Sequence, residues 1–127
     1  MRAEELRFGN YIYYNDKIIS VAPKAIEEFY YIGNTHSESL TDRRCYKPIE
    51  LTEEILLKCG FAFNHQVDYS FCELKINKNL KLRTDDSINY KYVYLQYMSL
   101  ELHKVQYLHE LQNLYFALTN EELTINL

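Results

Sequence analysis

Residues 105–118, VQYLHELQNLYFAL, decide the fold predicted for this chain. At about 100° per residue, the large apolar side chains of this stretch fall on one broad stripe of a helix. The stripe consists of Tyr107, Leu108, Leu111, Leu114, Tyr115 and Leu118. Such a stripe must be covered by another layer of structure. The sequence therefore predicts a long C-terminal helix that begins near His103 and packs on a sheet.

The same helix carries a second, half-apolar row beside the stripe. Because positions i, i+4, i+7 and i+11 align, this row consists of Val105, His109, Gln112 and Phe116. In one explanation the helix lies in a groove and contacts its own chain on two sides, with Gln112 or Asn113 bonded to a loop backbone. In the other, the row is the interface of a homodimer or of a complex with a protein partner. A catalytic role for His109 is disfavoured, because no nucleophile or acidic partner is spaced to orient it.

The N-terminal third has the pattern of a small sheet. Tyr11–Tyr14 and residues 17–22 favour extended structure, and Asn15-Asp16 between them can adopt the positive φ of a tight hairpin. Residues 28–33 are a predicted third strand closed by a glycine. Three short strands this close together predict a small curled antiparallel sheet of SH3-like type. Residues 34–48 have little periodicity and end at a proline, which predicts a connecting loop.

Residues 51–61, LTEEILLKCGF, predict a short central helix. Thr52 is a suitable N-cap, Glu53 and Glu54 favour the positive end of the helix dipole, and Gly60 can take the left-handed turn that ends a helix.

Further strands follow this helix. Residues 72–76 and 80–83 alternate apolar and charged side chains on either side of a polar Asn-Lys-Asn turn, which predicts a second hairpin with one solvated face. Residues 88–97 continue the strand pattern, and residues 100–102 add a short strand. We therefore predict one α+β domain over residues 1–127, made of an N-terminal β segment (1–33), a loop (34–48) and a helix-β-helix portion (49–127).

Composition disfavours several classes of protein. A formal charge of −4 disfavours nucleic-acid binding, which depends on cations that neutralise phosphates. The three cysteines are odd in number and widely spaced, so neither a disulfide framework nor a CxxC motif is predicted. The four histidines form no motif with metal-ligand spacing, and no glycine-rich phosphate loop or GxSxG motif occurs. No metal, cofactor or enzymatic activity is predicted. The N-terminus lacks the apolar core of a signal peptide, and no window approaches the length of a membrane span, so we expect a cytoplasmic protein.

Two groups of residues are candidates for ligand binding. On the strand over residues 88–97, three tyrosines share one side and could stack on a nucleotide ring, while cations of neighbouring strands could contact phosphate. This group consists of Tyr90, Tyr92, Tyr94, Lys81 and Arg83, and Lys75 and Lys91 could supply further phosphate contacts. The second group is the basic cluster of the predicted loop, which could bind a phosphate or an acidic partner and consists of Arg43, Arg44 and Lys47. Cross-strand packing of the tyrosines and ordinary solvation of the cations are the competing explanations.

Three blocks of the sequence, LRFGNYIYYNDKI, YKPIELTEEILLKCGF and VQYLHELQNLYFALTNEEL, carry a resemblance. Together they resemble an uncharacterised family of small proteins encoded by Bacteroidetes and by phages and prophages of those bacteria. The resemblance implies a bacterial or phage protein that works in the host cytoplasm, and it implies no chemistry. Where relatives often have glycine after FALT, this chain has Asn120, which can also take a left-handed conformation.

These observations lead to two functional hypotheses. The first is a non-catalytic binding protein of phage or mobile-element type that contacts a host or phage macromolecule, or a second copy of itself. The second is a small-ligand protein that binds or sequesters a nucleotide signal in phage counter-defence. The first is supported by the excess of tyrosine, with thirteen copies, since tyrosine is enriched at interfaces.

Overall fold

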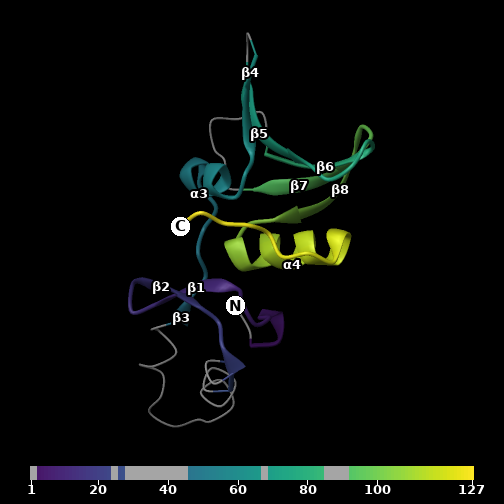
Figure 1. Ribbon diagram of the computed structural model, residues 1–127. Coiled ribbons are helices and arrows are strands. Elements are labelled where there is room, and N and C mark those ends of the chain that lie inside the picture. Colours follow the sequence, from purple (N-terminus) through teal and green to yellow (C-terminus); the bar gives the residue numbers. More distant parts are fainter. Residues whose placement is uncertain (1–2, 24–25, 28–45, 67–68, 85–91) are drawn as a thin grey trace.

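The computed structural model describes residues 3–23, 26–27, 46–66, 69–84 and 92–127. Within these ranges the strands form two antiparallel sheets, one of three strands and one of five, accompanied by the α-helices α3 and α4 and a short 3-10 helix. In Figure 1, α4 lies between the two sheets, so that the long C-terminal helix forms the middle layer. The α+β fold is confirmed. The elements are η1 Ala3–Glu5, β1 Tyr11–Tyr14, β2 Lys17–Ser20, β3 Tyr46–Lys47, α3 Glu53–Lys58, β4 Ala62–His65, β5 Ser70–Lys75, β6 Leu80–Thr84, β7 Val93–Tyr97, β8 Leu100–Val105 and α4 Leu108–Thr119.

The N-terminal sheet has the strand order β2-β1-β3. The hairpin of β1 and β2 is confirmed, and its turn residues Asn15 and Asp16 have φ values of 50° and 64°, as a tight hairpin turn requires. The third strand of this sheet is β3, which lies at the end of the predicted loop and pairs with β1. The strand predicted over residues 28–33, and the rest of the predicted loop up to residue 45, lie outside the described residues. The SH3-like form stays a prediction.

The short helix α3 is confirmed together with its predicted ends. The Thr52 hydroxyl oxygen accepts a hydrogen bond from the Ile55 backbone N–H at 3.2 Å, so Thr52 is the N-cap. Gly60 has a φ of 90° just after the helix, a conformation that glycine adopts without strain. Leu56 packs fully buried in the main core and fixes α3 against it.

The five-stranded sheet is a meander in the order β4-β5-β6-β7-β8, and the predicted second hairpin is its β5–β6 pair. Its two faces differ in character. Leu82, Val93 and Leu95 are buried on the face covered by the helices, whereas Arg83 and Tyr94, which pair across β6 and β7, are half-buried on the outer face. The predicted strand over residues 88–97 is described from Tyr92 onward.

The predicted start of the C-terminal helix near His103 is wrong. β8 continues to Val105, because His103, Lys104 and Val105 pair with residues of β7. Helix α4 begins only at Leu108, and the Glu110 carboxylate accepts the Tyr107 backbone N–H at 3.0 Å at this end. Helical periodicity alone placed the start of the helix about one turn too early, because pairing with the neighbouring strand β7 outweighs local helix propensity. At the other end Asn120 has a φ of 57°, so its predicted left-handed role is confirmed.

The hydrophobic core has two parts. The larger part lies between α4, α3 and the five-stranded sheet, and Leu108 and Leu111 of α4 are completely buried in it. The smaller part is formed by Leu6, Ile12 and Val21 with Tyr46 beside the N-terminal sheet. Helix α4 therefore has protein on two sides, which matters for the polar residues in its middle.

Candidate functional site

The predicted interface row on the C-terminal helix is not a surface row. Val105, His109 and Gln112 are no more than 3% exposed, and it is the chain itself that buries them. Val105 belongs to β8 and not to α4, so it has no helical alignment with the other three. Phe116 is half-buried, with the Arg7 guanidinium carbon 4.3 Å above its ring centre. The prediction of an interface along this row is wrong, because the N-terminal segment covers the side of α4 that a lone sheet would leave exposed.

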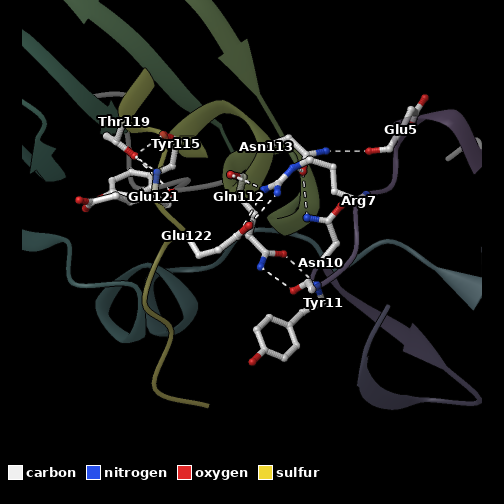
Figure 2. Close-up of polar contacts among 11 residues, drawn as sticks. Glu5, Arg7, Asn10, Tyr11, Gln112, Asn113, Tyr115, Thr119, Glu121 and Glu122 are labelled. Atoms are coloured by element: carbon white, nitrogen blue, oxygen red, sulfur yellow. Dashed lines mark hydrogen bonds and ion pairs between the residues drawn. The ribbon is translucent and has the colours of Figure 1, made fainter. Parts of the chain in front are cut away.

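Gln112 joins α4 to the first strand. Its side-chain oxygen accepts the Tyr11 backbone N–H at 2.8 Å, and its side-chain NH₂ donates to the Gly9 carbonyl at 3.2 Å (Figure 2). Both backbone groups would otherwise lack a partner at the start of β1, where the ladder with β2 begins. The prediction that Gln112 or Asn113 bonds to a loop backbone is confirmed.

Asn113 adds further hydrogen bonds between α4 and the N-terminal segment. Its NH₂ donates to the Glu5 carbonyl at 2.7 Å, and its side-chain oxygen accepts from the Asn10 amide at 2.9 Å and from Arg7 Nε at 2.8 Å. Arg7 also pairs with Glu122 beyond the end of α4 at 2.7 Å. Figure 2 shows that these side chains converge between the N-terminal segment and the helix. The polar residues in the middle of α4 therefore hold the fold together.

His109 lies beside these hydrogen bonds and is surrounded mainly by apolar side chains. Its side chain is completely buried, its Nε2 is 3.5 Å from a Glu5 carboxylate oxygen, and its ring lies parallel to that of Tyr107. Neither ring nitrogen makes a hydrogen bond within the described residues. Burial lowers the pKa of His109 below its usual value, and Glu5 and Glu110 act in the opposite direction. His109 is therefore a neutral, packed side chain at pH 7.

This lowered pKa predicts a loss of stability in mild acid. Between the folded-state pKa and the unfolded value near 6.5, the unfolded chain binds more protons at this site than the folded chain, so the free energy of unfolding falls as the pH falls. We expect this slope to be absent in His109→Gln, as measured by urea denaturation between pH 7.5 and about pH 5. An equal slope in the variant would assign the acid sensitivity to other groups.

Some of the tyrosines and cations predicted to bind a ligand lie together on the outer face of the five-stranded sheet. Arg83 and Tyr94 are directly opposite each other in the register, and Lys81 is one pleat further along β6 on the same face. The cations already have partners within the chain. The Arg83 guanidinium carbon lies 3.8 Å above the Phe71 ring centre, and Lys81 Nζ is 3.5 Å from a Glu73 carboxylate oxygen.

Tyr92 is covered in the same way, because Lys104 Nζ lies 4.0 Å above its ring centre. Two aromatic rings of this face, Phe71 and Tyr92, are therefore stacked under cations of the same chain. Tyr90, Lys91, Arg43 and Arg44 lie outside the described residues.

Lys47 is separated from the tyrosine group. It is exposed on β3 and lines an open groove of about 700 Å³ between the N-terminal sheet and α3. The groove carries charges of both signs, including Lys58, Glu54 and Asp16. Lys58 and Glu54 pair with each other at 3.2 Å. Acidic residues outnumber the lysines in this lining, so the groove does not favour the phosphate or acidic partner predicted for Lys47.

The surface of β8 is a candidate site that was not predicted from the sequence. Every residue from Leu100 to Lys104 is exposed, although β8 belongs to the larger sheet. Leu100 and Leu102 are 63% and 57% exposed, and Met98 in the preceding turn is 66% exposed. Together with the exposed Tyr97, these three residues define the apolar strip. The alternating Leu-x-Leu of residues 100–102 was the available signal, and extending the helix to His103 obscured it.

β8 is also an edge strand. Within the described ranges, its only neighbour in the sheet is β7. The ladder between them is irregular at Leu95 and Gln96, where β8 contains one more residue than β7. Such bulges twist an edge and interrupt regular pairing with a further strand.

The chemistry of the buried thiols disfavours nucleophilic use. Burial raises the pKa of Cys59 to about 12 and that of Cys72 to about 11, with Glu53 also raising the latter. Both cysteines are free thiols that stay protonated at neutral pH. The described part of the chain contains no group of three or more His, Cys, Asp and Glu side chains that could hold a metal ion.

The described residues include no helix with the length and apolar character of a membrane span. Comparison with models of known families, with curated proteins and with solved structures gave no match to this chain.

Proposed function

We propose that this protein is a non-catalytic binding protein that contacts a partner protein through the apolar strip Tyr97, Met98, Leu100 and Leu102. The observation that carries the proposal is the exposure of β8, where no residue from Leu100 to Lys104 is covered by the fold. Contiguous exposed apolar side chains are unfavourable in free energy in water, and they mark surfaces that are covered in a complex.

The charge beside the strip indicates the kind of partner. Met98 lies at the same end of the sheet as Lys75, Lys78 and Lys81, and all four line one hollow. A partner with an apolar centre and acidic groups at its rim would complement this arrangement. Because the bulge interrupts the edge of β8, we expect the partner to bind the side chains of the strip and not to add a regular strand to the sheet.

The resemblance described above supplies the setting of this proposal, which is a protein of phage or mobile-element origin acting in the cytoplasm of a bacterial host. The nucleotide-binding alternative has weaker support on the tyrosine-rich face, since the rings of Phe71 and Tyr92 already stack under Arg83 and Lys104. A ligand that stacked on those rings would have to displace both cations. For that face the alternative stays a prediction.

Site-specific photo-crosslinking in bacterial cells tests the proposal. A photoreactive phenylalanine analogue placed at Leu102 is expected to give a covalent adduct of defined mass with another polypeptide. The matched control is the same analogue at Leu57, which is 46% exposed on α3 and lies outside the strip. We expect no adduct from that position. The adduct at position 102 should also be reduced at least about tenfold by Leu100→Glu, since a buried charge without a partner costs well over 1.4 kcal/mol.

Mass spectrometry of the adduct identifies the partner. A second copy of the chain would give an adduct of twice its mass, and a host or phage protein would give a different mass. The absence of an adduct at Leu102, or equal yields at Leu102 and Leu57, would contradict the proposal.

A further inference from the structure

The tips of the β5–β6 and β7–β8 hairpins lie side by side at one end of the five-stranded sheet (Figure 1). The Met98 backbone N–H donates to the Asn79 carbonyl at 2.9 Å and ties the two tips together. Between them is a hollow of about 480 Å³. Its polar lining consists of Lys75, Asn77, Lys78, Asn79, Lys81 and Ser99, and no acidic side chain takes part.

This hollow concentrates positive charge, and of its three lysines only Lys81 pairs with a carboxylate of the described residues. Lys75 and Lys81 are directly opposite each other in the register of β5 and β6, a placement that is destabilising for like charges. Lys81 has one carboxylate contact, to Glu73 at 3.5 Å, whereas Lys75 and Lys78 make no ion pair within the described ranges. The chain as a whole has an excess of acidic residues, 18 against 14 basic ones. A hollow with three lysines and no acid is therefore contrary to the average charge of the molecule.

The backbone around the lysines is fixed by hydrogen bonds. The Asn77 side-chain oxygen accepts the backbone N–H groups of Asn79 and Leu80, both at 3.0 Å, and closes the turn that carries Lys78. On the other tip Met98 has a φ of 56°, a conformation that the bond to Asn79 helps to hold. Hydrogen bonds within the chain therefore hold the two hairpin tips that carry the lysines, without a contribution from a ligand.

We propose that this hollow binds a small, multiply charged phosphate, such as the diphosphate or triphosphate group of a nucleotide. Lysine ammonium groups donate up to three hydrogen bonds each, and their bonds to phosphate oxygens are charge-assisted. The Asn79 amide and the Ser99 hydroxyl line the same hollow and supply neutral donors. The volume falls in the range of small-ligand sites, about 300–1,000 Å³.

The net charge of the protein favours a small anion over a polymer. A long polyanion would extend beyond the three lysines onto a surface that is acidic on average, and each unneutralised phosphate there would weaken binding. A diphosphate or triphosphate places its whole charge within the hollow. This proposal shares Met98 and the three lysines with the proposed partner surface, but it does not require the apolar side chains Tyr97, Leu100 and Leu102.

Isothermal titration of the full chain with inorganic pyrophosphate and tripolyphosphate tests the proposal, with sulfate at equal ionic strength as the reference ion. We expect both phosphates to bind at least about tenfold more tightly than sulfate. The double variant Lys75→Gln and Lys81→Gln should weaken pyrophosphate binding at least about tenfold. The matched control Lys47→Gln, on exposed β3, should leave it unchanged. A nucleoside triphosphate that binds more tightly than tripolyphosphate would add a contact to the nucleoside and would support a nucleotide as the ligand.

The stability of the free variants provides a second readout. Because Lys75→Gln removes one of two like charges that face each other and breaks no ion pair of the described residues, this unliganded single variant should unfold at the same or a higher denaturant concentration, whereas Lys81→Gln also removes the contact with Glu73. Loss of pyrophosphate binding in a chain of undiminished stability supports a binding role. Equal binding of sulfate and pyrophosphate, or an equal loss of affinity in Lys47→Gln, would overturn the proposal. Leu102→Glu should not affect pyrophosphate affinity, which separates this proposal from that of a protein-binding strip.

Discussion

Replacing Gln112 with leucine is expected to lower the free energy of unfolding by about 3 kcal/mol. Gln112 is 2% exposed and satisfies both the Tyr11 N–H and the Gly9 carbonyl. Leucine has nearly the same size but can pair with neither group. Both hydrogen bonds are partly buried, and a buried backbone group that loses its partner costs about 1–3 kcal/mol. Urea denaturation followed by circular dichroism measures the effect.

The matched control is Gln106→Leu. Gln106 is half-buried just before α4, and its side chain makes no hydrogen bond within the described residues, so we expect its replacement to change stability by less than about 0.5 kcal/mol. Hydrogen exchange should locate the damage in Gln112→Leu, because the amides of β1 and β2 would open more readily. Equal effects of the two substitutions would show that Gln112 does not join the N-terminal sheet to the helix.

The second prediction compares a buried with an exposed leucine. Leu111 is completely buried between α4 and the larger sheet, so Leu111→Ala is expected to destabilise the protein by about 2–5 kcal/mol through lost burial and a residual cavity. Leu102→Ala removes the same number of carbon atoms from the apolar strip. We expect it to change stability by less than about 0.5 kcal/mol, since Leu102 is 57% exposed.

This contrast bears directly on the proposed function. If Leu102→Ala is neutral for folding but weakens binding of the partner identified by crosslinking, the leucine contacts that partner. A loss of about 2 kcal/mol or more in Leu102→Ala would mean that the fold covers this side chain, and the strip would no longer be a free surface. Both variants can be compared by thermal or urea denaturation under the same conditions.

Much of the fold could be predicted because its signals are local. The turn at Asn15 and Asp16 follows from residues that tolerate positive φ, and α3 follows from its Thr52 cap and its Gly60 stop. The alternation of apolar and charged residues predicted the β5–β6 hairpin with its correct partner. Each of these elements is determined by a handful of neighbouring residues.

The candidate site was predicted less well, because exposure depends on what else packs nearby. Val105, His109 and Gln112 have the spacing of a second helix face, yet the N-terminal segment buries two of them and β8 includes the third. Arg83 and Tyr94 were correctly expected to lie together, but their sequence gave no sign that Arg83 would stack on Phe71. The three lysines of the hollow come from two strands and one turn, and only the register of β5 and β6 brings Lys75 opposite Lys81.

By itself, the sequence determined the α+β class, the helices α3 and α4 and the hairpins β1–β2 and β5–β6, since caps, turns and periodicity act within a few residues. Only the tertiary structure decided which side of α4 is covered and which strand is left exposed at the edge of the sheet. The physical reason is that burial is a property of pairs of distant segments. In the sequence Gln112 resembles a surface residue, but it is buried because its side chain pairs with the backbone groups of Gly9 and Tyr11. Leu102 resembles a core residue, but no layer of the described chain covers it.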